Sequence, residues 1–281
     1  MIISDPLQVL PEALGKGPLP VTVVPDAAAL SRHFADMMLD EYAAARAARR
    51  ATVVFIVPVG PVGQYDLLAA RCNIERISLR KLLLIGMDEY LTPEGDWIAE
   101  DDPLSFRGHM RRHLWDVLDP ALVPPPEHRI FPHPARLGEI PGLIARHGGV
   151  DMCFGGVGIA GHLAFNEPPE PGEAVDAAEF AARSTRAVRL ARESRTINAV
   201  TVWGGAIGRI PERAVTVGMR EILGSRKLRL FLNRPWQRAV LRQALFGPVT
   251  PAVPASFAQH HPDAAVVATA EATRLPEPTL A

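Results

Sequence analysis

Short apolar runs alternate with amphipathic stretches along most of the chain. Runs of strand length stand at 21–24, 51–57, 81–86 and 150–154, with later candidates at 215–217, 227–231 and 264–268. Between them, apolar residues at helical spacing predict helices from Asp26 to about Arg50, over 64–72 and over 105–118. Strands separated by helices predict one α/β domain over residues 1–281, a Rossmann-like three-layer α/β/α arrangement around a mainly parallel sheet.

Three segments rich in glycine, proline or acidic residues directly follow predicted strands. They are 58–63, 88–90 and 155–167. In parallel sheets, ligands bind beyond the carboxyl ends of the strands, where such segments meet. We therefore expect one site there, bordered by a mobile loop over 168–176, whereas the proline-rich segment 124–134 predicts a surface loop.

The composition allows a sizeable buried core. Hydrophobic residues make up 48% of the 281 residues, and the net charge is −1. A nucleic-acid binder needs a basic stripe and a membrane helix needs about 18 consecutive apolar residues, and the sequence has neither. Cys72 and Cys153 stand beside apolar runs and predict buried thiols, and the first residues lack the pattern of a signal peptide. We therefore expect a cytoplasmic protein with neither nucleic-acid nor membrane partners.

The segment after the run at 150–154 matches the G-x-G-x-x-G pattern through Gly156, Gly158 and Gly161. A dinucleotide site also needs a helix opening at the third glycine and an acidic residue about 20 positions further on. Here Pro168 and Pro169 stop any helix within two turns, and no strand is predicted at the required place. The pattern therefore predicts a tight turn beside a ligand rather than a nucleotide cofactor site.

The same glycine loop carries His162, Asn166 and Glu167. A carboxylate close to an imidazole can orient and charge it, and glycines let the backbone approach a ligand. Taken singly, a histidine and a glutamate are more often a buried core residue and a surface residue. Their occurrence together in one glycine-rich loop favours a catalytic or binding site.

Two other patterns have the residue types of metal sites, but the sequence predicts no metal site. An acidic run over 96–102 is better explained as a solvated loop before a helix that Ser105 caps. His109 and His113 have ligand spacing on one helix face, but no glutamate directly follows His109.

Two segments resemble the signature segments of the glucosamine-6-phosphate deaminases. They are Met87-Asp88-Glu89-Tyr90 and the run from Gly156 to Pro168, which includes Gly161-His162-Leu163-Ala164-Phe165-Asn166-Glu167. A third segment, Thr216-Val217-Gly218, is similar to a further segment of that family. The related 6-phosphogluconolactonases share the fold but lack the Ala-Phe-Asn-Glu-Pro run after the histidine, so the resemblance favours the deaminases.

The resemblance implies a deaminase/isomerase that acts on an aminosugar phosphate with release of ammonia, and neither a metal nor an organic cofactor. Asp88 corresponds to the base that moves a proton between C1 and C2 of the open-chain sugar, since aldose–ketose isomerisation passes through an enediol or enolamine. His162 corresponds to the residue that opens the sugar ring, and Glu167 to the carboxylate that supports it. We expect further substrate contacts from residues in and around these segments: Gly60, Glu89, Gly158, Gly161 and Asn166.

The sequence departs from the family at three places. Ala160 stands where the deaminases carry an aspartate two residues before the histidine, so the imidazole lacks one partner. The turn 58–63 lacks the threonines that hold the phosphate in the family, and Pro61 has no N–H to donate. The family's phosphate-binding lysine, just before a late helix, is also missing from the segment 234–238.

These departures leave three interpretations open. In the first, arginines such as Arg195 and Arg238 rebuild the anion site, which suits guanidinium geometry. In the second, the isomerase or deaminase takes a different, unphosphorylated sugar. In the third, the chain is a non-catalytic sugar-binding regulatory protein. All three predict a small-molecule sugar or sugar-phosphate partner, and a homo-oligomer is compatible with each.

Overall fold

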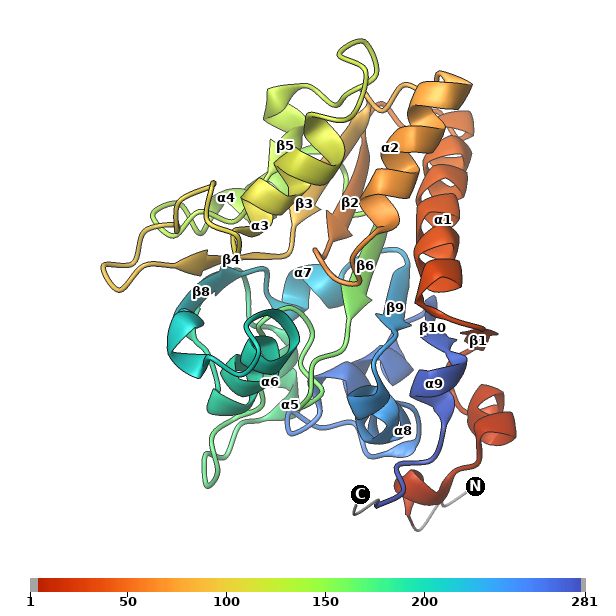
Figure 1. The fold of residues 1–281 in the computed structure, drawn as a ribbon, viewed down its shortest axis with the longest axis vertical. Helices are drawn as coiled ribbons and strands as arrows, with labels where there is room; N and C mark the ends of the chain where they lie inside the picture. Colours follow the sequence, from red (N-terminus) through yellow and green to blue (C-terminus); the bar gives the residue numbers. More distant parts are fainter. Residues whose placement is uncertain (1–4, 279–281) are drawn as a thin grey trace.

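Seven parallel strands form the central sheet of the computed structural model, which describes residues 5–278 (Figure 1). The strands are β1 (Val21–Val24), β2 (Val53–Val57), β3 (Leu82–Gly86), β5 (Arg129–Ile130), β6 (Met152–Gly156), β9 (Leu228–Leu232) and β10 (Ala264–Thr269). Across the sheet their order is β1-β10-β9-β6-β2-β3-β5, and every neighbouring pair is parallel. The predicted mainly parallel sheet is therefore confirmed.

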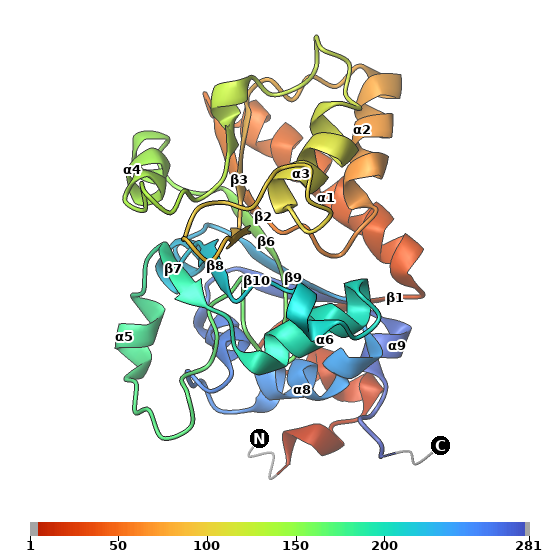
Figure 2. The ribbon, with the colours of Figure 1, turned by 60° about the vertical axis from the view of Figure 1, so that its left-hand side comes forward.

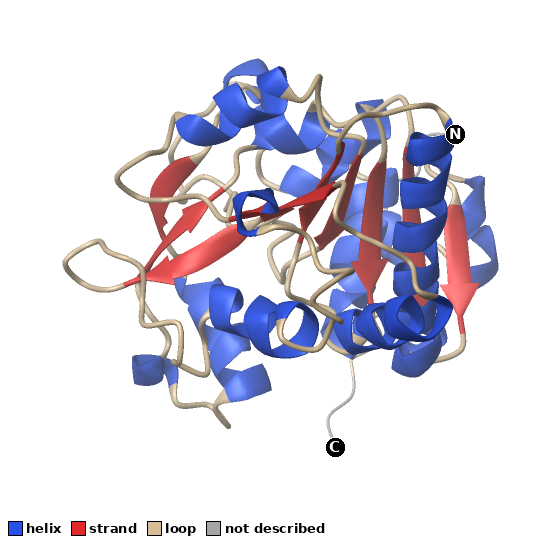
Figure 3. Ribbon diagram, turned by 90° about the horizontal axis from the view of Figure 1, so that it is seen from above, coloured by secondary structure: helices blue, strands red, loops and turns tan. Residues whose placement is uncertain are grey.

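Helices cover both faces of this sheet, which gives the predicted three layers (Figure 3). One face carries α1 (Ala27–Ala47), α2 (Gln64–Glu75) and α3 (Phe106–Met110), which continues into a π-helical turn over Arg111–Trp115. The other face carries α4 (Glu139–Arg146), α5 (Ala177–Ala181), α7 (Met219–Leu223), α8 (Arg238–Phe246) and α9 (Ala270–Thr273). Side chains alternate along β2, since Phe55 packs on the first face and Val54 and Ile56 on the second.

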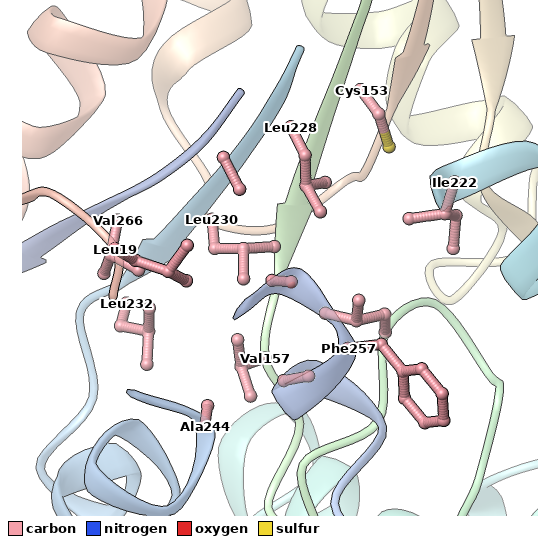
Figure 4. Close-up of a cluster of buried hydrophobic side chains, with 14 of the residues drawn as sticks. Leu19, Cys153, Val157, Ile222, Leu228, Leu230, Leu232, Ala244, Phe257 and Val266 are labelled. Atoms are coloured by element: carbon pink, nitrogen blue, oxygen red, sulfur yellow. The ribbon is translucent and has the colours of Figure 1, made fainter. Parts of the chain in front are cut away.

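A buried cluster on the second face fixes the sheet to α8 (Figure 4). Leu228, Leu230 and Leu232 of β9 belong to it, together with Val266 of β10 and Ala244 of α8. Each of these leucines is at most 1% exposed, and burying a leucine side chain contributes about 1.5–3 kcal/mol. Because the loop after β9 contributes to the candidate site described below, this packing helps to hold that site in place.

A second sheet of three antiparallel strands follows directly on the carboxyl end of β3 (Figure 2). Its strands are β4 (Asp88–Leu91), β7 (Arg186–Arg189) and β8 (Arg213–Thr216), in the order β4-β8-β7. Apolar side chains that include Tyr90 and Ala214 pack this sheet against Ala199 of α6 (Arg192–Val202). The expectation that the run at 215–217 belongs to the parallel sheet is wrong, because β8 pairs with β4 and β7 instead.

The predicted helices begin close to the expected residues. Asp26 accepts a hydrogen bond from the N–H of Ala29 (2.7 Å), and Ser105 accepts one from the N–H of Gly108 (3.1 Å), so both residues cap helices. The proline-rich segment 124–134, predicted as a surface loop, also contains the short edge strand β5. The two cysteines are buried free thiols, as predicted. None of the helices within residues 5–278 is both long enough and apolar enough to cross a membrane.

Candidate active site

A cavity of about 540 Å³ opens at the carboxyl ends of β2, β3, β6 and β9. Its walls come from the segments that follow these strands, from the start of α3 and from the end of α6. They include residues 58–62, Asp88, Tyr90, Phe106, His109, residues 156–158, His162, Asn198, Trp203, Asn233, Arg234, Trp236 and Gln237. The three segments that the sequence places at the site therefore all contribute to one cavity.

Asp88 is the first residue of β4, and it lines the cavity. Burial and the charge of the neighbouring Glu89 raise the pKa of the Asp88 carboxyl group from its ordinary range to about 8. A base whose pKa lies near the working pH exists there in both protonation states. Asp88 is therefore suited to take up a proton and return it.

Glu89, the next residue, is not part of the cavity wall, because successive side chains of a strand point to opposite faces. Its carboxylate is fully buried and accepts hydrogen bonds from the hydroxyl of Ser105 (2.8 Å) and from the N–H groups of Phe106 (3.1 Å) and Arg107 (2.9 Å). The first N–H groups of a helix otherwise lack partners. Glu89 therefore holds the start of α3 and does not line the cavity.

His162 reaches the cavity from the glycine loop after β6. Its Nδ1 atom lies 2.9 Å from Oε2 of Glu167 and 3.2 Å from Oγ of Ser194. Oxygen atoms on this side favour a proton on Nδ1 of the neutral ring and leave the lone pair of Nε2 free. On the Nε2 side the ring packs against Gly158, where a Cβ atom would overlap it. Gly60, expected beside the substrate, also lines the cavity.

Glu167 supports His162 from outside the cavity wall. Burial alone would raise the pKa of Glu167, but the charge of His162 and the nearby polar groups of Ser194 and Ala191 outweigh burial and lower this pKa. The carboxylate is therefore charged near neutral pH, and it faces Nδ1 of the imidazole. The structure thus brings Asp88 and His162 into one cavity, with Glu167 in contact with the histidine.

Asn166 and Gly161 shape the glycine loop and do not line the cavity. The amide of Asn166 donates a hydrogen bond to the carbonyl of Val217 (2.9 Å) and accepts one from Arg186 (2.7 Å). Gly161 has a φ of +82°, a backbone conformation that favours glycine. Hydrogen bonds and backbone geometry therefore assign both residues to the loop itself.

The two arginines expected to bind an anion also lie outside the cavity. Nη1 of Arg195 lies 3.1 Å from a carboxylate oxygen of Glu212, and Arg238 is paired with Glu271. Arg195 lines a different pocket, together with Arg189, Arg192 and Ile207. Both arginines are thus engaged in ion pairs outside this cavity.

Arg234 lies at the cavity instead, in the turn between β9 and α8. Its side chain is exposed, and none of the ion pairs within residues 5–278 includes it. The buried Gln237 fixes the turn, because its side-chain oxygen accepts hydrogen bonds from the N–H groups of Asn233 and Arg234 (both 2.8 Å). Its side-chain nitrogen donates to the carbonyl of Val157 in the glycine loop (2.7 Å). Arg234 is therefore the arginine that this turn presents to a ligand.

The rest of the cavity wall is largely apolar and contains one neutral histidine. Trp203, which follows α6, is 41% exposed and lines the cavity. The hydroxyl of Tyr90 accepts a hydrogen bond from Asn198 (3.0 Å), which ties β4 to α6. Burial, with the charges of neighbouring basic side chains, lowers the pKa of His109 to about 4. Within the described part of the chain, no group of three or more His, Cys, Asp and Glu side chains is placed to hold a metal ion.

No family model matches the chain. Among curated proteins, it is 30% identical over 213 residues to a glucosamine-6-phosphate deaminase of Lachnoclostridium phytofermentans, a match that covers 74% of this chain and 82% of the relative. It is 29% identical over 240 residues to a glucosamine-6-phosphate deaminase of Porphyromonas gingivalis, covering 81% of this chain and 82% of the relative. These matches span most of both sequences.

Solved structures have the same fold. A monomeric glucosamine-6-phosphate deaminase superposes with a TM-score of 0.75 at 24% identity, over 90% of this chain and 98% of the other. A 6-phosphogluconolactonase from Trypanosoma cruzi superposes with a TM-score of 0.62 at 16% identity, over 90% of this chain and 94% of the other. The fold is thus shared by two groups of enzymes. This chain is 24% identical to the deaminase structure and 16% identical to the lactonase structure. This chain belongs to the glucosamine-6-phosphate deaminase family.

Proposed function

We propose that this protein is a deaminase/isomerase of an aminosugar phosphate of the glucosamine 6-phosphate type. The observation that carries the proposal is the pairing, in one cavity, of Asp88, whose pKa is raised to about 8, with His162, whose Nδ1 contacts Glu167. One group suits transfer of a carbon-bound proton, and the other suits transfer between oxygen atoms. The relatives named as glucosamine-6-phosphate deaminases support the same chemistry.

Ring opening comes first and falls to His162. Its Nδ1 faces Glu167 and Ser194, so Nε2 is the atom that exchanges a proton with the substrate. The ring oxygen gains a proton from Nε2 while the hydroxyl group on C1 loses one, which yields the open-chain aldehyde without a net change in composition. The charged carboxylate of Glu167 stabilises the imidazolium form between these two transfers.

Asp88 performs the second step. Its carboxylate takes the proton from C2 of the open-chain aminosugar while the carbonyl oxygen on C1 gains one, which leaves an enolamine. The carboxylate then returns its proton to C1 as the amino group loses one. The product is a ketose imine, which water hydrolyses to the ketose and ammonia. Because Asp88 is buried beside a second carboxylate, its proton affinity is raised toward that needed to hold a proton taken from carbon.

Arg234 is our candidate for binding the phosphate. The turn 58–62 on the other side of the cavity presents proline and valine side chains without hydroxyl groups, so a side-chain cation has to supply charge. A guanidinium group can donate two parallel hydrogen bonds to a phosphate. A second candidate function is the same reaction on an unphosphorylated aminosugar, which the apolar turn at 58–62 favours.

The proposal is tested by incubating the protein with glucosamine 6-phosphate and, separately, with glucosamine. Ammonium and ketose should form in equal amounts from the phosphorylated sugar. Asp88→Asn should lower kcat by about 10²- to 10⁴-fold, the usual effect of a general base, because an amide cannot accept the proton. Turnover of glucosamine alone would select the second candidate. Thermal stabilisation by a sugar without turnover of any aldose or aminosugar would contradict both and indicate a binding protein.

A further inference from the structure

Ser194 is a fully buried residue in the first turn of α6, and it contacts the proposed ring-opening histidine. Its Oγ atom lies 3.2 Å from Nδ1 of His162, on the same side of the ring as Oε2 of Glu167. The nearby hydroxyl group of Ser194 also contributes to lowering the pKa of Glu167. Ser194 therefore contacts the imidazole directly, and its hydroxyl group lies near the carboxylate of Glu167.

The other hydroxyl-bearing residues of α6 behave differently. Thr196 donates its hydroxyl hydrogen bond to the carbonyl of Arg192 (2.8 Å), and Thr201 donates to the carbonyl of Ile197 (2.9 Å). Such bonds to the preceding turn of the same helix are the ordinary state of a helical threonine. The hydroxyl of Ser194 is instead directed at a side chain from a different element, the glycine loop after β6. This contact is therefore specific to the site and not a property of the helix.

We propose that Ser194 is a positioning residue, which holds His162 with its Nδ1 proton toward Glu167 and leaves Nε2 for the substrate. The proposal rests on the function proposed above. In the resemblance to the deaminases, Ala160 stands where an aspartate would be a further partner of the histidine, and its methyl group cannot form a hydrogen bond. Ser194 supplies a polar partner for the imidazole from a different element, the first turn of α6.

The absence of this partner has a definite chemical consequence. An imidazole with one anchor can rotate or place its proton on Nε2, and then it cannot accept a proton from the substrate there. Loss of a group that orients a functional histidine typically costs about 10- to 100-fold in activity. The loss should fall on kcat, because Ser194 is not part of the cavity wall and does not contact the substrate.

The test compares Ser194→Ala and Ser194→Thr with the matched control Thr196→Ala, which removes an exposed hydroxyl group from the same helix. NMR of protein with ¹⁵N-labelled histidine reports the share of His162 that carries its proton on Nδ1, and His162→Gln assigns the signal. In Ser194→Ala this share and kcat should both fall, with KM little changed. Ser194→Thr should retain both quantities, and Thr196→Ala should behave as the wild type.

An unchanged His162 tautomer and an unchanged kcat in Ser194→Ala would overturn the proposal and leave Ser194 as an ordinary buried serine. If Ser194→Ala does not fold, Ser194→Cys keeps the size with a weaker hydrogen-bonding group, and the same two results decide. The NMR measurement needs no substrate. Failure of the wild type to release ammonia would therefore contradict the proposed function while the tautomer still decides the role of Ser194.

Discussion

The imidazole of His162 lies so close to Gly158 that a Cβ atom on Gly158 would overlap Nε2, Cε1 and Cδ2 of the ring. The backbone of Gly158 does not have a positive φ, so this contact is the main obstacle to a side chain there. We expect Gly158→Ala to displace the ring and to lower kcat by about 10²-fold or more, within the usual range for losing an acid–base group. Steady-state kinetics and thermal unfolding check this.

Gly138→Ala is the matched control, because a Cβ at Gly138 meets no atom within 4 Å. Both variants should keep the wild-type far-ultraviolet circular dichroism spectrum. Equal activity of the two variants would show that the ring of His162 can move away from Gly158 without consequence, and that this contact does not position it.

The raised pKa of Asp88 predicts a pH-dependent stability difference. The folded protein binds the Asp88 proton more tightly than the unfolded chain does, since the pKa is about 8 against an ordinary 3.8. This contribution to stability is fully present below about pH 4 and is lost as the pH rises toward 8. Asp88→Asn does not titrate. The free energy of unfolding of Asp88→Asn should therefore increase relative to that of the wild type between pH 4 and 8, by about 1.4 kcal/mol per pH unit at most.

Urea unfolding of both proteins at several pH values measures this difference, and a constant offset across the range would contradict the raised pKa. The rate should respond to the same group. Because the base acts in its ionised form, kcat/KM of the wild type should rise with pH up to about 8.

Replacing Arg234 should discriminate between phosphorylated and neutral sugars. Arg234→Ala removes the arginine of the cavity wall and should raise KM for a sugar phosphate by about 10- to 100-fold, the worth of a hydrogen bond to a charged group. Affinity for the unphosphorylated sugar should not change. Arg189→Ala serves as the control, because Arg189 is exposed and pairs with Glu212 away from this cavity. Equal losses for both sugars would show that Arg234 acts on the fold and not on an anion.

Restoring a carboxylate at Ala160 should depend on Ser194. In the wild type, Nδ1 of His162 already has two oxygen partners, so Ala160→Asp should change turnover by less than about 3-fold, a small effect on the scale of 1.4 kcal/mol per factor of ten. In the Ser194→Ala background the same change should recover part of the lost kcat. A double-mutant cycle measures this coupling, and purely additive effects would contradict it.

The parallel sheet could be predicted because its strands are continuous apolar runs, buried on both faces. The three-stranded antiparallel sheet could not be predicted from the sequence. Strands β4 and β7 are four residues long and rich in polar side chains, and β4 follows β3 after the single residue Met87. These strands are stabilised by pairing with β8 and by packing against α6, contacts between residues far apart in sequence. Local patterns carry little information on such pairing.

The sequence located the candidate site more reliably than the direction of each side chain. Asp88 and His162 directly follow buried strands, so their place at the carboxyl ends could be inferred from order alone. Ser194 stands among charged residues in an exposed-looking helix, and its burial arises only when α6 packs over the glycine loop. Arg234 and Arg238 both flank the start of α8, and only the turn held by Gln237 shows which of them faces the cavity.

The two adjacent carboxylates of β4 have different roles: Glu89 holds an element of the cavity wall, and Asp88 faces the cavity. Glu89 anchors the first residues of α3, and its negative charge also contributes to the raised pKa of Asp88. A neutral side chain in place of Glu89 would therefore loosen the start of α3 and also lower the proton affinity of Asp88. Neither effect needs contact between this residue and a ligand. The packing of α3 and the proton affinity of Asp88 therefore both depend on Glu89. Adaptation of the site to a new working pH has to proceed through other neighbours of Asp88.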